Sequence, residues 1–200
     1  MKTSWLSIKA QRRRPTSRAS VYASLAARAI GHEPNSEWLA RLCASWLVGH
    51  GAMPDYLGLE PEEFWALADR YFPGARLSGV AASGLRIDFT RMLERGDLRS
   101  LLLRHAARPG TQEARWLSDI LLVGCMGGEH LWQDLGLWSR ADLSGLIAHN
   151  FPLLAARNNR NMKWKKFFYK QLCEAEGIYV CRAPSCEVCS DYPKCFGPED

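Results

Sequence analysis

Apolar residues recur at helical spacing in one segment of the chain after another. Residues 36–49 show the pattern clearly, with five apolar side chains on one predicted helix face: Trp38, Leu39, Leu42, Cys43 and Trp46. The same period predicts further helices over 20–30, 61–72, 85–105, 112–124, 139–151 and 161–177. No stretch alternates apolar and polar residues between turn signals, as half-buried strands do. We therefore predict an all-α fold in a single helical domain.

Local signals predict where several of these helices begin and end. Ser36 is a candidate N-cap for residues 36–49. Pro61 suits the first turn of the next helix, where acidic residues follow it and the helix dipole favours them. Ser139 and Asp142 have the spacing of a capping box, and we expect their helix to end at Pro152.

Two segments resemble each other in the order of their residues. Leu47-Val48-Gly49 matches Leu122-Val123-Gly124, Leu57-Gly58-Leu59 matches Leu135-Gly136-Leu137, and Phe72-Pro73 matches Phe151-Pro152. One interpretation is two helix–loop–helix units packed about a pseudo-twofold axis. The other is that similar helix-ending signals recur by chance.

Charge is distributed unevenly along the 200 residues. The net charge is +5, yet the first 31 residues hold seven basic residues and no acid, so the remainder is slightly acidic. We predict a flexible basic arm over 1–17, the helical domain over 18–176 and a C-terminal loop over 177–200. A near-neutral body argues against a nucleic-acid-binding domain. The chain shows neither a secretory signal nor a membrane span, so we expect a cytoplasmic protein with reduced cysteines.

The C-terminal loop holds four of the seven cysteines within fifteen positions. Cys181, Cys186, Cys189 and Cys195 follow the spacing Cys-x4-Cys-x2-Cys-x5-Cys. Structural zinc sites usually place two cysteine pairs on either side of a small fold, for which these spacers are too short. A tight thiolate set suits an iron–sulfur type of cluster, which needs ligands from several directions. We rank that cluster above zinc, and zinc above a redox disulfide.

Basic residues flank this loop on both sides. The predicted helix over 161–177 buries Trp164, Phe167, Phe168 and Leu172 on one face. Its lysines, together with two basic residues of the loop, are candidates to offset the charge of a thiolate-ligated cluster or to dock an acidic partner: Lys163, Lys165, Lys166, Lys170, Arg182 and Lys194. The plainer interpretation for most of the lysines is an ordinary solvated helix face.

The glycine-rich stretch GCMGGEHLW, residues 124–132, supplies two further candidate ligands. Cys125 and His130 lie where glycines let the backbone approach another group closely. His130 is a candidate additional ligand of the metal or an aid to its entry. The favoured alternative is that His130 orients the following turn and that Cys125 is a small buried residue. Cys43 and Cys173 lie on apolar faces and are predicted to be core residues.

The chain resembles the NifQ family most strongly from about Gly124 to Gly197 and more loosely back to residues 57–75, and the basic arm lies outside the resemblance. The motifs that carry the resemblance are CMGGEHLWQDLGLWSRADLSGLIAHNFPLLAARNNRNMKWKKFFYKQLC and VCRAPSCEVCSDYPKCFG, and the four-cysteine spacing matches completely. The resemblance implies a bacterial, cytoplasmic protein that carries a molybdenum–iron–sulfur cluster, formed on an iron–sulfur precursor. It implies that Cys181, Cys186, Cys189 and Cys195 are the cluster ligands. It also implies donation of molybdenum to the scaffold and reductase proteins that assemble the nitrogenase cofactor.

Two other classes of protein compete with a metal carrier that is not an enzyme. Some helical DNA-repair glycosylases end in a similar four-cysteine cluster loop. The chain shows neither their helix–hairpin–helix glycine motif nor a suitably placed catalytic Asp, and the segment KWKKFFYK is explained equally well by helical periodicity. A zinc-stabilised interaction module is the third class.

Overall fold

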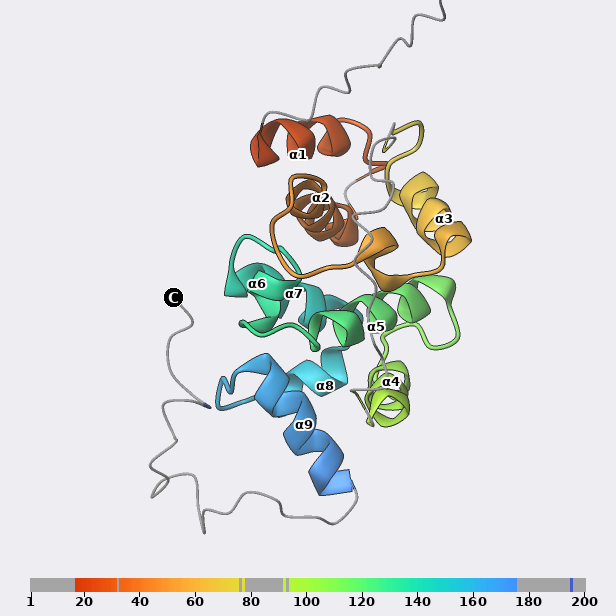
Figure 1. Cartoon of the computed structure of the whole chain (residues 1–200). Helices are drawn as coiled ribbons and strands as arrows, with labels where there is room; N and C mark the ends of the chain where they lie inside the picture. Colours follow the sequence, from red (N-terminus) through yellow and green to blue (C-terminus); the bar gives the residue numbers. More distant parts are fainter. Residues whose placement is uncertain are drawn as a thin grey trace, which may run out of the picture.

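We analysed a computed structural model, which describes residues 17–31, 33–75, 77, 92, 94–175 and 195. Every regular element in these residues is helical, which confirms the predicted all-α fold (Figure 1). The order along the chain is α1 (Arg18–Ala26), α2 (Pro34–Leu47), the short 3₁₀ helix η1 (Asp55–Gly58), α3 (Pro61–Tyr71), α4 (Arg95–Arg104), α5 (Gln112–Gly124), α6 (Leu131–Asp134), α7 (Arg140–Asn150), α8 (Pro152–Arg157) and α9 (Trp164–Ala175).

The helix termini follow the local signals in most places. Pro61 is the first residue of α3, as predicted. The capping box of α7 is also confirmed, because the Ser139 hydroxyl accepts from the backbone N–H of Asp142 at 3.1 Å and the Asp142 carboxylate accepts from the Ser139 N–H at 3.1 Å. α7 ends before Pro152, but Pro152 then begins the separate helix α8, which periodicity did not predict.

The predicted N-cap of α2 is wrong. The helix begins at Pro34, with Glu33 at the capping position, and Ser36 is a buried residue of the first turn. Proline has a fixed φ suited to the first helical turn and no N–H to leave unsatisfied, so it starts this helix two residues before Ser36. The predicted helix over 85–105 is described only from residue 94 onward apart from Met92, and α4 begins there at Arg95.

The same order of elements occurs twice, and it extends beyond the matched residues. The first unit is α1–α2–η1–α3 and the second is α4–α5–α6–α7. The backbone at the end of α3 and α7 is nearly identical, with φ −137° and ψ 62° at Phe72 and φ −136° and ψ 56° at Phe151. Both phenylalanines are fully buried. This equivalence supports two related units over the chance recurrence of helix-ending signals.

The two units contact each other reciprocally through a glycine at the C-terminal end of each short helix, Gly58 as the last residue of η1 and Gly136 two residues after α6. A Cβ placed on Gly58 would lie 2.5 Å from Cγ2 of Val123 near the end of α5. A Cβ on Gly136 would lie 2.7 Å from Cβ of Ser45 near the end of α2. Glycine is required at both positions because a side chain of the other unit occupies the space that a Cβ would need. Each unit therefore inserts its turn against the other unit's long helix.

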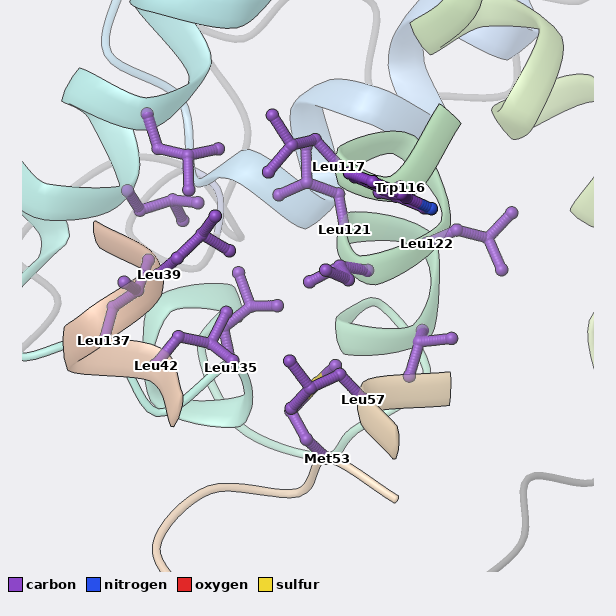
Figure 2. Close-up of a cluster of buried hydrophobic side chains, with 14 of the residues drawn as sticks. Leu39, Leu42, Met53, Leu57, Trp116, Leu117, Leu121, Leu122, Leu135 and Leu137 are labelled. Carbon is purple, nitrogen blue, oxygen red and sulfur yellow. The ribbon is translucent and has the colours of Figure 1, made fainter. Parts of the chain in front are cut away.

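The core lies between the two units. Figure 2 shows leucines of α2 and α5 meeting side chains from η1 and from the turn after α6. Those labelled there are all buried: Leu39, Leu42, Met53, Leu57, Trp116, Leu117, Leu121, Leu122, Leu135 and Leu137.

The helix α9 closes the domain after the two units. Its predicted apolar face is confirmed, since Trp164, Phe167, Phe168 and Leu172 are buried and the helix packs beside α4 (Figure 1). Cys43 is in the core as predicted. Cys173 is only half-buried and does not belong to the core cluster, so its predicted core position is wrong.

Candidate metal centre

One cysteine of the C-terminal motif lies within the described residues. The Cys195 carbonyl oxygen accepts a hydrogen bond from the backbone N–H of Lys163 at 2.8 Å. Lys163 directly precedes α9, and its own carbonyl accepts from the Phe167 N–H at 2.9 Å, in the first turn of the helix. Cys195 is half-buried and packs against the hydrophobic core. It thus lies at the N-terminal end of α9, whereas Ala175 ends the same helix at the opposite end.

The other motif cysteines, Cys181, Cys186 and Cys189, lie outside the described residues, as do Arg182 and Lys194. Within the part of the chain that is described, no three His, Cys, Asp or Glu side chains gather as a metal site. The four-cysteine centre therefore stays a prediction, and the structure gives the position of only one of its predicted ligands, Cys195.

The candidate lysines of α9 have different environments. Lys166 is exposed, as a solvated helix face requires. Lys170 is also exposed and pairs with Glu174 at 3.3 Å, one turn further along. Lys165 is different: its ammonium group forms an ion pair with the Asp134 carboxylate and donates to the Gly127 carbonyl at 2.7 Å. Lys165 is thus engaged inside the domain rather than on a solvated face.

The glycine-rich stretch folds around Asp134. This carboxylate is 3% exposed and accepts from the Glu129 backbone N–H at 3.1 Å in addition to Lys165. A Cβ on Gly127 would collide with it, so the close approach expected of this stretch is made to Asp134. Neither Asp134 nor its pairing with Lys165 was found from the sequence. Their only signal is an acid at the end of a short helix and a lysine more than thirty residues later.

The two candidate ligands of this stretch have structural positions. His130 is the N-cap residue of α6, and its backbone N–H donates to the Gln133 side chain at 3.1 Å. Cys125 is buried at the end of α5. Burial raises the pKa of its thiol to about 12, the nearby Asp134 carboxylate adds to the rise, and the Lys165 ammonium opposes it. A buried thiol with so high a pKa is protonated at neutral pH and is a poor metal ligand.

The fold and the cysteine-rich end define a class: an all-helical domain with a candidate cysteine-ligated metal centre at one helix end. No described helix has the length and apolar character needed to cross a membrane. No solved structure matches the chain.

Known proteins match most of the chain. A model of the NifQ family matches residues 38–197. Protein NifQ of Azotobacter vinelandii is 45% identical over 183 residues, which covers 86% of this chain and 93% of that protein. Protein NifQ of Rhodobacter capsulatus is 42% identical, with 80% and 84% covered. Protein NifQ of Klebsiella pneumoniae is 36% identical, with 82% and 99% covered.

The chain belongs to the NifQ family. Membership of this family supports a role in nitrogen fixation, namely in the synthesis of the iron–molybdenum cofactor. The matched range includes all four cysteines of the C-terminal motif.

Proposed function

We propose that this protein carries a molybdenum–iron–sulfur cluster on Cys181, Cys186, Cys189 and Cys195 and donates its molybdenum during synthesis of the nitrogenase cofactor. An iron–sulfur cluster on the same ligands is the precursor that receives molybdenum. The observation that carries the proposal is the family match, which extends through the complete cysteine motif to residue 197.

The surroundings of Cys195 favour an anionic cluster. A cluster held by thiolates is net negative, and the N-terminal end of a helix carries the positive end of its dipole. Cys195 lies at that end of α9 and is held there through the Lys163 amide. Lys163 and the exposed Lys166 add positive charge at the same end. The charge of the cluster would thus be partly offset at this end of α9.

The chemistry of the ligands also fits a molybdenum carrier. Molybdate is an oxidised, oxygen-bound ion, whereas the cofactor holds molybdenum among sulfides. Soft thiolate and sulfide ligands favour metal in a sulfur-rich shell, so a cluster on this motif prepares molybdenum for insertion. The protein is then a carrier rather than an enzyme. Its partners are the cytoplasmic scaffold and reductase proteins of cofactor assembly.

Metal analysis of the protein purified without oxygen tests the proposal. We expect molybdenum, iron and acid-labile sulfide bound to the chain, and their loss in Cys189→Ala. Cys43→Ala is the matched control, because Cys43 is buried in α2 away from the motif and its loss should leave the metal content unchanged. Iron that survives Cys189→Ala would refute the proposal.

The two competing classes give other results in the same preparation. Zinc in place of iron, without sulfide, would identify an interaction module. Tight binding to duplex DNA with an abasic site would identify a repair protein. The family assignment favours the carrier over both.

A further inference from the structure

The last helices of the two units, α3 and α7, correspond residue by residue. Each contains 11 residues and is followed by a phenylalanine with nearly the same φ and ψ. In this register Phe64 and Leu67 of α3 correspond to Leu143 and Leu146 of α7, and all four side chains are buried. The two helices therefore turn the same face toward the core, and their remaining faces can be compared directly.

The face of α7 beside its core face is covered by two other helices. The Ser144 hydroxyl accepts a hydrogen bond from Nε1 of Trp164 in α9 at 3.1 Å. Next to it, a Cβ on Gly145 would lie 2.9 Å from the ring of Trp38 in α2. In the second unit this face is therefore a surface against which aromatic side chains of other helices pack.

The corresponding face of α3 is exposed. Trp65 and Ala66 stand there in place of Ser144 and Gly145, and Trp65 is 45% exposed. Its ring is nevertheless held, because it lies edge to face with the ring of the fully buried Phe64, with centroids 5.3 Å apart. A held aromatic ring can be buried by a partner at little cost in side-chain entropy, and tryptophan is enriched among the residues that dominate binding energy. The first unit thus presents an apolar anchor where the second unit binds helices.

Carboxylates border Trp65 on both sides. Glu62 and Asp69 lie one turn before and one turn after it, and both are exposed on the same side of α3. The corresponding residues of α7 are alanines, so the negative charge is a property of α3 alone. Arg70, the only basic residue of α3, pairs with two carboxylates outside the helix, at 3.2 and 3.4 Å. The exposed stripe of Glu62, Trp65, Ala66 and Asp69, here called the Trp65 stripe, is therefore apolar at its centre and acidic at its ends.

We propose that the Trp65 stripe docks an amphipathic helix of a partner protein, one whose aromatic or aliphatic stripe is bordered by lysine or arginine. The apolar part of this chemistry is that of α9, whose aromatic stripe covers the corresponding face of α7. The basic part follows from the acidic ends of the Trp65 stripe, since complementary charges favour and orient such contacts. Figure 1 shows α3 at the edge of the domain, apart from α9. The proposal goes beyond the proposed function and does not rest on it.

A labelled peptide with the sequence of residues 162–175, carrying Cys173→Ser, is a probe with this chemistry. Its fluorescence anisotropy, measured while the full chain is added under reducing conditions, gives the affinity. Trp65→Ala should bind the peptide at least about tenfold more weakly than the unchanged protein, because the anchor is lost. The control Tyr169→Ala removes an exposed aromatic side chain of α9 and should bind as the unchanged protein does. Equal affinity in the two variants, or no binding by the unchanged protein, would overturn the proposal.

A second pair of variants tests the charge and keeps the test decisive if Trp65→Ala disturbs the fold. Glu62→Gln/Asp69→Asn changes only exposed side chains, so it should weaken peptide binding and remove most of its dependence on sodium chloride. The control Asp97→Asn/Glu129→Gln removes the same charge from exposed sites elsewhere and should keep the salt dependence. The same salt dependence in both double variants would contradict the acidic ends of the stripe. Equally tight binding of a peptide with glutamine at every lysine would contradict the basic partner.

Two other occupants of the stripe give different results. A dimer in sedimentation velocity that Trp65→Ala abolishes would assign the stripe to a second copy of the chain. Peptide binding that appears only in Arg12→Gln/Arg13→Gln/Arg14→Gln would assign it to the chain's own basic arm. Either result would overturn docking of a partner protein. Trp65→Ala should retain the metal content of the unchanged protein, so failure of this surface and failure of the proposed cluster are separate outcomes.

Discussion

Asp134 joins three parts of the molecule at the scale of a single residue. Its carboxylate holds the glycine-rich stretch through the Glu129 N–H and holds α9 through Lys165. Its backbone carbonyl accepts from the Ala52 N–H in the first unit at 2.8 Å. A buried carboxylate needs such partners, because an uncompensated charge in the interior is strongly destabilising.

Replacing Lys165 with methionine should lower the free energy of unfolding by about 3 kcal/mol, since it leaves the Asp134 carboxylate buried without its cation. Urea unfolding of the metal-free protein measures this. Lys166→Met, one residue along on the exposed face, is the matched control and should change stability by less than about 0.5 kcal/mol. Partial recovery in Asp134→Asn/Lys165→Met would support the ion pair as the cause, and equal effects of the two lysine substitutions would contradict it.

The sequence predicts the residues of this cluster only in part. The glycines of residues 124–128 predict that the backbone there lies close to another group, and the structure confirms this at Gly127, whose backbone lies against the Asp134 carboxylate. Its target, Asp134, and the cation, Lys165, become neighbours only when α9 packs against the second unit. Periodicity assigns Lys165 to the polar face of α9, and that assignment is correct for the helix. It does not reveal that part of this face is covered by another segment.

At the scale of elements, the two short helices and the glycines at their C-terminal ends connect the units. Gly58 and Gly136 both have positive φ, at +79° and +74°, and both meet the other unit's long helix. The turn and the contact thus require glycine for two separate reasons, its backbone conformation and its missing side chain.

Gly58→Ala should destabilise the protein more than Gly110→Ala. Both glycines have φ near +80°, so both variants incur the left-handed backbone cost of about 1 kcal/mol. The Cβ at residue 110 meets nothing within 4 Å, whereas at residue 58 it meets Val123, which adds about 1–3 kcal/mol of overpacking. Thermal or urea unfolding compares the two. Val123→Ala in the Gly58→Ala background should recover part of the loss, and equal losses in the two glycine variants would argue against the contact.

At the scale of the whole molecule, each unit buries one cysteine that the proposed function does not use. Cys43 belongs to α2 of the first unit, and Cys125 follows α5 of the second. Burial raises the pKa of both thiols from the ordinary 9.0 to about 12. Both contribute to folding as small apolar groups in their protonated form.

The stability of the metal-free protein should fall as the pH rises from about 9 to about 12. In this range the thiols of the unfolded chain ionise while the buried thiols stay protonated, so unfolding releases protons. Each thiol contributes a slope of up to about 1.4 kcal/mol per pH unit. Urea midpoints across the range measure it. Cys43→Ala should reduce the slope of the urea midpoint against pH. Met53→Leu changes a buried side chain that does not titrate, so it should lower the midpoint equally at every pH and leave the slope unchanged. An unchanged slope in Cys43→Ala would exclude this thiol as a source.

The sequence by itself determined the helical class, most helix ends, the buried stripe of α9 and the repeated order of elements. These are local properties: an apolar period of 3.6, a proline at a first turn or a capping box acts within one or two turns of the chain. Only the tertiary structure decided which polar faces are covered, as at Lys165, where a side chain packs against a glycine, as Val123 does at Gly58, and that Cys195 lies at the start of α9. Those outcomes depend on contacts between residues far apart in the chain, and no local pattern records which distant segments will pack together.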